Sequence, residues 1–417
     1  MARTRLTGVL ALAALALAGC SSGNDTTNPP GGTSLSYAPC TRADYWPVVL
    51  LAIQDGTGPW KVLTPSGGTY STTVQSSKLG MLVATAATSG GGSEVDVVYA
   101  SAAEAEAYLT GLQCGSSLLT GSITVNNLAA GELAFVGLGW NSSAASGPGN
   151  KTFTTQAPAN PADLLGVLNT ASANATKMII RRGVNVTAVA PMDFTTAEAF
   201  APLLPSLAIT GTGTTPVTFA EWYLSGGIFR NEINYGNAST TLPTTYWGVP
   251  AAKQAASDLH ELYAYTAETP IGGVAQTRVI DAWWHDPASR TLSFDPLPSA
   301  PTITTKASAP YPQLRIQWQQ PSGHQYFSIY YYNTIGGDQE ATLTATAAYL
   351  GGTAVDIAFP DVSTLTGWNN TWMPVAGVPT TWGFTDYRST GIQSVLGYAP
   401  TDGQVTQSNS FRSSLTP

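Results

Sequence analysis

Three histidines are the natural candidates for acid–base or metal chemistry, because a neutral imidazole takes up a proton or binds zinc near neutral pH. His260-Glu261 begins the pattern H-E-x-x-H, in which two histidines one helical turn apart bind zinc. Ala264 stands where the second histidine belongs, so the sequence predicts no zinc site there. We expect Asp258 to Tyr265 to form a strand end with a hydrogen-bonded imidazole.

The other two histidines lie beside turn residues. His285-Asp286 pairs an imidazole with a carboxylate that could orient it as a general base, but Asp286-Pro287 favours a turn. His324 is expected in a loop between strands. The nucleophile-elbow pattern G-x-S-x-G spans Gly19 to Gly23, where no strand precedes it and no helix follows. The sequence therefore predicts no catalytic residues, and we expect no enzyme.

Cofactor and metal motifs are also missing from the sequence. Gly211-Thr212-Gly213 lacks the third glycine of a phosphate-binding loop. The turn at Asp55-Gly56 offers a single carboxylate, whereas calcium needs six to eight oxygen ligands. We therefore expect no cofactor and no metal. The alternative is an envelope hydrolase with its active site at a module interface, which needs His260 or His285 close to a carboxylate and a hydroxyl.

Aromatic side chains are present in surplus, with 11 Trp and 18 Tyr in 417 residues. Successive residues of a strand face opposite ways, so some rings of Tyr330-Tyr331-Tyr332 must face solvent or another domain. Exposed rings of this kind bind sugars or a protein partner, whereas buried ones fill cores and domain joints. Trp368, Trp372 and Trp382 form the candidate ligand-binding site.

The fold class follows from short apolar runs that alternate with turns about every ten residues, which is typical of β-sandwiches. One helix is predicted, at Ala102–Leu109, because Ala and Glu favour helices. The predicted class is all-β, built from tandem β-sandwich modules. The predicted strands include Pro47–Ile53, Trp60–Leu63, Thr69–Val74, Met81–Thr85, Val95–Tyr99, Ser122–Val125, Leu133–Gly137, Thr152–Thr155, Lys177–Val184, Phe219–Leu224, Glu232–Tyr235, Leu259–Tyr265, Val279–Trp284, Leu314–Trp318 and Tyr326–Tyr332.

Low charge limits the kind of partner. Charged residues make up 10% of the chain and the net charge is −8, which argues against nucleic acid because phosphates need clustered cations. The one adjacent basic pair, Arg181-Arg182, is expected at a solvated strand end. Hydrophobic residues make up 43% of the chain, enough to build cores rather than a disordered protein.

Four modules are predicted after the N-terminal region. A five-residue similarity between Ser101–Ala105 and Thr195–Ala199 suggests repeated units, and Pro296–Pro301 marks a joint. The predicted ranges are a β-sandwich at 43–115, a second at 116–206, a β-rich module at 207–298 and a last module at 299–417. In the last module Trp318, followed by Pro321 and a tyrosine-rich strand, resembles the start of a fibronectin type III domain.

The N-terminal residues have the features of a targeting signal. Arg3 and Arg5 precede the apolar run Val9–Ala18, which is too short to span a bilayer, and Gly19-Cys20 follows. This segment resembles the signal peptides of bacterial envelope lipoproteins. The resemblance implies that residues 1–19 are a signal peptide and that Cys20 is lipidated, for instance by palmitate. The protein would then be anchored outside the cytoplasm, at the outer membrane or the cell surface.

Residues 20–42 are rich in Ser, Pro and Gly and are expected to form the lipidated N-terminus and a flexible tether. With Cys20 assigned to lipid, Cys40 and Cys114 remain, and an exported chain favours a disulfide between them. The alternative is two buried free thiols.

Together these features are similar to bacterial envelope lipoproteins built from tandem immunoglobulin-like or fibronectin type III-like sandwiches. We expect a membrane-anchored, non-enzymatic protein for binding, adhesion or scaffolding, with a glycan or an envelope protein as partner and no nucleic acid. The hydrolase is the alternative, and a purely structural spacer is a third hypothesis.

Overall fold

The structure, a computed structural model, describes residues 32–39, 46–87, 92–111, 118–139, 142–170, 175–211, 216–226, 229–235, 244–333, 338–389 and 400–417. Cys20, Cys40 and Cys114 lie outside these residues, and so do the predicted signal peptide, lipidation site and disulfide. The all-β prediction is confirmed, because the described chain forms 27 strands and only two short α-helices, α1 (Ala102–Gly111) and α2 (Ala347–Leu350). None of the described helices is long and apolar enough to cross a membrane.

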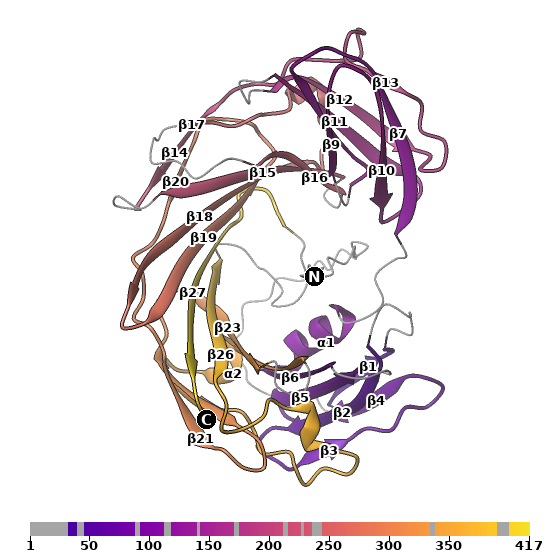
Figure 1. Ribbon diagram of the computed structural model, residues 1–417. Helices are drawn as coiled ribbons and strands as arrows, with labels where there is room; N and C mark the ends of the chain where they lie inside the picture. The colour runs from indigo at the N-terminus through magenta and orange to yellow at the C-terminus, as the bar shows by residue number, and fades with distance from the viewer. Residues whose placement is uncertain are drawn as a thin grey trace.

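One 12-stranded sheet runs through the molecule and curves along one side of it (Figure 1). Its strands are antiparallel to their neighbours except for the pair β24 and β6, which is parallel. Strands of three predicted modules, 43–115, 207–298 and 299–417, therefore share one sheet. Their order is β16 (Phe229–Tyr235), β15 (Val217–Ser225), β18 (Leu259–Ile271), β19 (Val274–Trp284), β27 (Val405–Leu415), β26 (Thr380–Ser389), β23 (His324–Asn333), β24 (Asp338–Thr346), β6 (Gly92–Ser101), β5 (Lys78–Ala86), β2 (Val48–Asp55) and β3 (Trp60–Val62).

The last strand of the chain, β27, lies inside this sheet. It pairs with β19 from Ala282–Val405 to Ala275–Arg412 and with β26 from Ser389–Thr406 to Thr380–Leu415. β27 therefore joins the two halves of the sheet. On one side it pairs with β19, which is more than a hundred residues earlier in the chain, and on the other side it pairs with β26 of the last module.

The strands β23 and β26 carry aromatic residues on both faces of the 12-stranded sheet. One of these two faces is buried and forms a hydrophobic core. A three-stranded sheet of β21 (Thr302–Ala307), β22 (Gln313–Gln319) and β25 (Ala354–Ala358) packs on it. The packing follows from strict alternation, which aims every second side chain inward. The large residues of this core include Trp318, Phe327, Ile329, Tyr331, Phe359, Trp382, Phe384 and Phe411.

Residues 33–37, expected within the flexible tether, form strand β1 (Thr33–Tyr37) and pair with β4 (Tyr70–Val74). The reason is hydrophobic burial, because Leu35 and Tyr37 alternate inward against the helix α1 and the strands β2, β5 and β6. The helix predicted at Ala102–Leu109 is confirmed as α1, and it covers the same side of the sheet as β1 and β4.

The range 116–206 contains a β-sandwich of two sheets. Its first sheet is β10 (Gly149–Ala157), β7 (Leu119–Leu128) and β13 (Met192–Asp193), and its second is β12 (Ala175–Val184), β11 (Ala162–Thr170), β8 (Glu132–Gly137) and β9 (Ser142–Ser146). The second sheet is buried on both faces, because its outer face packs Leu165, Val167 and Met178 against Tyr223 and Trp247. This contact joins the sandwich to the end of the 12-stranded sheet.

Another small sheet covers the 12-stranded sheet near its β16 end, on its core side. It consists of β17 (Thr244–Thr245), β14 (Ser206–Thr210) and β20 (Arg290–Ser293), and it packs on β15, β18 and β19. The remaining regular elements are two single-turn helices, η1 (Ala251–Lys253) and η2 (Asn370–Trp372).

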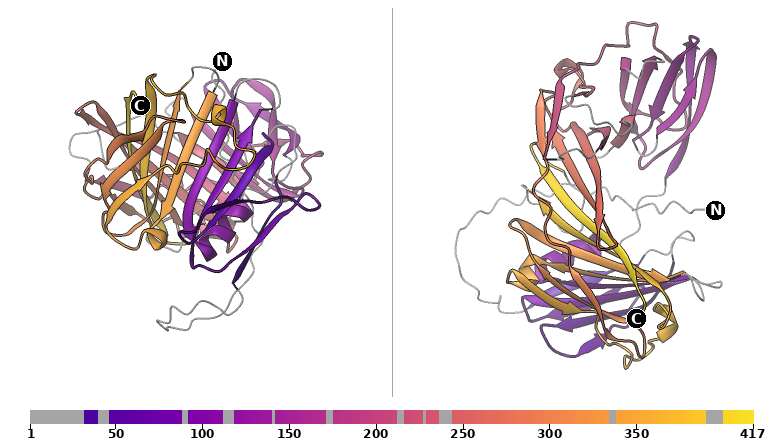
Figure 2. Two further views of the ribbon diagram at one scale, coloured as in Figure 1. Left: turned by 90° about the horizontal axis from the view of Figure 1, so that it is seen from below. Right: turned by 60° about the vertical axis from the view of Figure 1, so that its left-hand side comes forward.

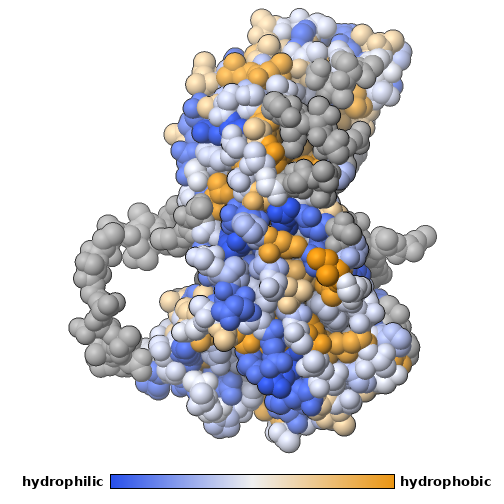
Figure 3. Space-filling view, turned by 90° about the vertical axis from the view of Figure 1, so that its left-hand side faces the viewer, coloured by the Kyte–Doolittle hydropathy of each residue, from blue (hydrophilic) through white to orange (hydrophobic). Residues whose placement is uncertain are grey.

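The 12-stranded sheet therefore has a core face and a concave face. The core face carries the sheet of β21, β22 and β25 and the sheet of β17, β14 and β20, and the concave face carries α1 and lies toward the middle of the curved molecule (Figure 1). The sheet twists strongly between its ends, as the right-hand view in Figure 2 shows. On the convex side, apolar residues form separate groups among polar ones (Figure 3).

Replacing Phe411 in β27 with alanine should destabilise the whole chain. Phe411 is 0% exposed and packs beside Phe384 in the core, so Phe411→Ala should cost about 3–5 kcal/mol of unfolding free energy. Urea unfolding followed by circular dichroism measures this loss. Ser414→Ala, at an exposed position of the same strand, serves as the control. A loss below about 1 kcal/mol for Phe411→Ala would place β27 outside the core.

Candidate functional site

His260 is a buried structural residue of β18. The Val249 N–H donates to its Nε2 at 2.9 Å, so Nε2 holds the lone pair and Nδ1–H donates to the Trp284 carbonyl at 3.2 Å. Burial lowers the pKa of His260 to about 4, although the Trp284 carbonyl favours the protonated form. Both nitrogens are occupied by backbone groups, so the expected hydrogen-bonded imidazole is present.

His285 belongs to a buried polar joint around Asp258. Its Nδ1 lies 2.9 Å from the Asp258 carbonyl, and the Asp258 carboxylate, 0% exposed, accepts hydrogen bonds from Tyr223 and Arg182. These hydrogen bonds hold the pKa of Asp258 below its ordinary value despite its burial. Arg182 also pairs with Asp163. Arg182 is exposed close to the end of β12, as expected of a solvated strand end, and its ion pair with the buried Asp258 ties β12 to the residue that precedes β18.

His324 begins β23 rather than lying in a loop, so that expectation is also wrong. Its side chain is 2% exposed, and its Nδ1 lies 2.6 Å from Asp386 Oδ1. Its Nε2 has no hydrogen-bond partner, so no hydroxyl completes a nucleophile–base–acid chain here. Trp318 and Phe327 pack against the ring, which makes the pair a buried polar contact of the core.

The arrangement that the hydrolase alternative requires is not found among the described hydrogen bonds. The ring nitrogens of His260 bind backbone groups, and so does Nδ1 of His285. The described side chains also include no group of three or more His, Cys, Asp or Glu placed to hold a metal ion.

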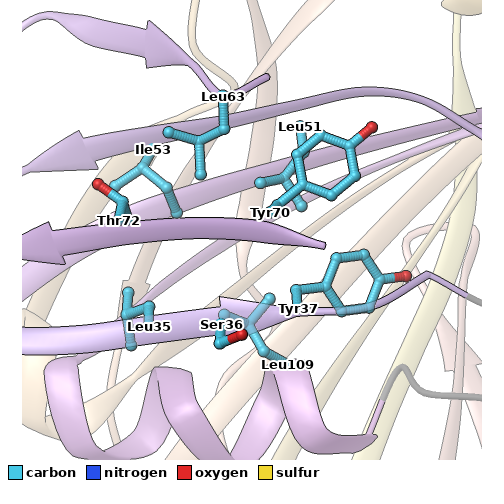
Figure 4. Close-up of a pocket in the computed structure, with 9 residues that line it drawn as sticks. All are labelled: Leu35, Ser36, Tyr37, Leu51, Ile53, Leu63, Tyr70, Thr72 and Leu109. Carbon is cyan, nitrogen blue, oxygen red and sulfur yellow. The ribbon is translucent and has the colours of Figure 1, made fainter. Parts of the chain in front are cut away.

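A small apolar cavity lies between α1 and the strands β1, β2 and β4 (Figure 4). Leu35, Leu51, Ile53 and Leu109 line it beside the stacked rings of Tyr37 and Tyr70. Its volume is about 180 Å³, which includes space open to solvent. Ligand pockets usually measure about 300–1,000 Å³, so this cavity is a packing gap rather than a binding site.

The structure brings together two of the three predicted tryptophans. Trp368 and Trp372 meet edge to face at 5.4 Å, and Trp368 Nε1 donates to Asn370 Oδ1 at 2.8 Å. Both rings are half-buried at the edge of the core formed by β22, β23 and β26. Trp382 is 5% exposed and lies within that core, so its ring faces other core residues rather than solvent.

A second aromatic group lies on the concave face, and we call it the tyrosine strip: Tyr326, Tyr330, Tyr332 and Tyr387. The rings of Tyr326 and Tyr387 stack at 4.3 Å and 11°, and those of Tyr330 and Tyr332 stack at 6.2 Å and 19°. Tyr330 lies flat across the backbone of Gly383, because a Cβ at Gly383 would be 2.4 Å from Tyr330 Cζ. All four rings are half-buried, so each keeps part of its surface accessible.

Alternation along β23 explains how the tyrosine strip forms. Tyr331 points to the core face, where it is fully buried and donates its hydroxyl to the Pro312 carbonyl at 2.8 Å. Tyr330 and Tyr332 on either side of it therefore point to the concave face. At the far end, Arg412 Nη2 donates to Tyr332 Oη at 2.8 Å.

Carboxylates lie beside the tyrosine strip on the next two strands of the sheet, β24 and β6. Tyr332 is opposite Glu340, which is opposite Glu94, and Tyr330 is opposite Thr342, which is opposite Asp96. Burial, with the charges of Glu94 and Glu340, raises the pKa of Asp96 well above its ordinary value, and a hydrogen bond with Thr342 opposes the shift. The concave face thus combines aromatic rings, hydroxyls and carboxylates.

The sequence predicted this group only in part. It placed one ring or more of Tyr330-Tyr331-Tyr332 outside a core, but it favoured the tryptophans as the site. The signal that identifies the rest is long-range pairing, since Tyr387, Gly383 and Asp96 come from strands that neighbour β23 and β24 only in the fold.

Comparison with known proteins adds no relative. No protein-family model matches the chain, and no curated protein matches it significantly.

The stability of the protein should depend on pH through His260. Its pKa falls from 6.5 in the unfolded chain to about 4 in the fold, so its contribution is complete above pH 6.5 and is lost as the pH falls toward 4. The loss attributable to this residue should be about 3 kcal/mol. Urea unfolding between pH 7 and 4 measures it, with His260→Asn as the comparison. Equal pH dependence in both proteins would contradict the assignment.

Proposed function

We propose that the protein is a lipid-anchored, extracytoplasmic binding protein of the bacterial cell envelope that binds a saccharide on its concave face. The lipobox-like segment ending at Cys20 supports the anchor, and the Ser-, Pro- and Gly-rich residues that follow support a tether. The absence of catalytic motifs in the sequence supports binding rather than reaction. The partner is held by the sheet, not by a pocket.

The tyrosine strip is the observation that carries this proposal. Tyr330, which lies across the backbone of Gly383, presents one ring face outward, and a sugar ring offers C–H groups to such a face and hydroxyls to polar neighbours. Ser328, Thr342 and Thr385 supply hydroxyls around the rings on the same side of the sheet. None of the hydrophobic clusters of the described residues includes the four tyrosines, which supports a role outside the core.

The strand order of the last module supports its resemblance to fibronectin type III domains. Strands β21, β22 and β25 form one sheet, and β24, β23, β26 and β27 are consecutive neighbours in the other. Such sandwiches serve as binding modules in many unrelated proteins, so this likeness supports the fold and leaves the ligand to the site.

Saccharide binding should depend on the tyrosine strip. In an oligosaccharide array, the double variant Tyr330→Ala, Tyr387→Ala should bind its best ligand about five- to hundredfold more weakly, because two aromatic contacts of about 0.5–1.5 kcal/mol each are lost. Circular dichroism checks that the variant is folded.

Trp368→Ala is the matched control, because Trp368 belongs to the other aromatic group. It should leave binding unchanged. Loss of binding in Trp368→Ala with normal binding in the tyrosine variant would place the site at the tryptophans instead. An array with no bound saccharide would overturn the proposed function.

The anchor has its own test. Cys20→Ala removes the atom that the proposed lipid modifies, so the protein should move from the membrane fraction to the soluble fraction after cell lysis. Intact mass spectrometry of the unaltered protein should show cleavage before Cys20 and an acyl addition. A Cys20→Ala variant that stays in the membrane fraction would contradict the anchor.

A further inference from the structure

The segment 246–249, which we call the clasp, is held by all four of its backbone N–H groups. Two of them donate to backbone carbonyls. The N–H of Trp247 donates instead to the carboxylate of Glu221 on β15, at 2.9 Å. The N–H of Val249 donates to Nε2 of His260 on β18, also at 2.9 Å. Half of the hydrogen bonds that these N–H groups donate therefore depend on titratable side chains.

The side chains of the clasp fill the joint between the β-sandwich and the 12-stranded sheet. Trp247 is 2% exposed and Val249 is fully buried. Both belong to one apolar cluster with Leu165, Val167 and Met178 on the outer face of the sandwich. Release of the clasp would therefore remove two of the buried side chains that join the sandwich to the sheet.

The two titratable partners of the clasp respond differently to acid. A protonated carboxyl keeps a carbonyl oxygen, so Glu221 can accept the Trp247 N–H in either state. A protonated imidazole carries a proton on both nitrogens. Since Nδ1–H of His260 already donates to the Trp284 carbonyl, the second proton is added at Nε2, which faces the Val249 N–H. Two donors then face each other, and this hydrogen bond is lost.

The surroundings of His260 give a second proton little compensation. Burial lowers the pKa of His260 to about 4, and the charge of Asp258 opposes this shift. Glu261 points to the other face of the sheet, because it directly follows His260 on β18. No carboxylate is among the hydrogen-bond partners that the structure describes for the ring. The other titratable or charged side chains of the elements around it are Glu221 and Tyr223 on β15, Tyr246 in the clasp, Lys253 on η1, His285 and Asp286 after β19, Arg290 on β20 and Arg182 on β12.

A second contact across the same joint resists acid. The guanidinium of Arg182 on β12 forms an ion pair with Asp258. Burial opposes the charge of Asp258, but hydrogen bonds from Tyr223, two backbone N–H groups and Arg182 hold the pKa of Asp258 below its ordinary value. This ion pair therefore persists at a pH at which His260 takes up its second proton.

We propose that the clasp is an acid-sensitive contact, in which protonation of His260 releases residues 246–249 while Arg182 and Asp258 keep the sandwich attached as a hinge. The sandwich then gains freedom relative to the 12-stranded sheet, and the sheet itself stays folded. This device does not depend on the saccharide proposed above.

Amide hydrogen exchange of the full chain in detergent tests the clasp at pH 7 and pH 4, after correction for the intrinsic effect of pH on exchange. The pKa of His260 is 6.5 in a released clasp and about 4 in a held one, so opening is about a hundredfold more frequent at pH 4. Protection of Trp247 and Val249 should fall by that factor and lie at least about tenfold below that of β23. Protection of Gly226 and Ala255, whose N–H groups donate to Asp258, should stay unchanged.

Two variants assign the effect to one side chain. His260→Gln offers an amide oxygen to the Val249 N–H and does not titrate, so the clasp should be equally protected at both pH values. Glu221→Gln is the matched control, because it removes the other titratable partner of the clasp and leaves His260 in place. It should keep the hundredfold loss.

Equal protection of the clasp and β23 at pH 4 would mean that the clasp opens only with the whole fold, which overturns the inference. Loss of the pH effect in Glu221→Gln would assign it to that carboxyl and also overturn the inference. A parallel loss of protection at Gly226 and Ala255 would remove the hinge. If His260→Gln does not fold, the unaltered protein still decides, since unchanged protection of the clasp between pH 7 and pH 4 contradicts the proposal.

Discussion

The pairing of β27 between β19 and β26 is the constraint on which the rest of the structure depends. Buried backbone N–H and C=O groups need partners, and β27 supplies them to strands on both sides. Without it the 12-stranded sheet would divide into two parts with new edges. Because it is present, the strands that carry the tyrosines and carboxylates, β26 to β6, are continuous with β19 to β16, and Arg412 on β27 lies on the same face as the tyrosines.

The strongest elements of the fold could be predicted from the sequence, because their apolar side chains repeat with a clear period. The run Leu314–Trp318 became β22 and Tyr326–Tyr332 became part of β23. The strand β27 was missed because its core-facing positions include Gln407 and Asn409, which hydrogen-bond with Asp295 and Asp386 instead of packing as apolar residues. A strand without apolar alternation gives no sequence signal, however central it is.

The candidate site was predictable to a smaller extent. The surplus of aromatic residues and the alternation within Tyr330-Tyr331-Tyr332 pointed to rings outside a core. The partners of those rings were not predictable, because Tyr387 and Asp96 reach the same face through pairings between strands that are far apart in the sequence. Trp382 was assigned to the site although it lies in the core. The sequence could not distinguish these positions, because a large ring next to a turn is compatible with either.

Amide hydrogen exchange of the full chain tests the central claim most directly. If β27 lies within the sheet, the amides of residues 406–411 exchange as slowly as those of β23, because both strands have paired neighbours on each side. The exposed residues Thr364, Thr366 and Gly367 of the loop at residues 361–367 supply the fast reference. Exchange of 406–411 as fast as this loop would contradict the continuous sheet, and with it the single concave face.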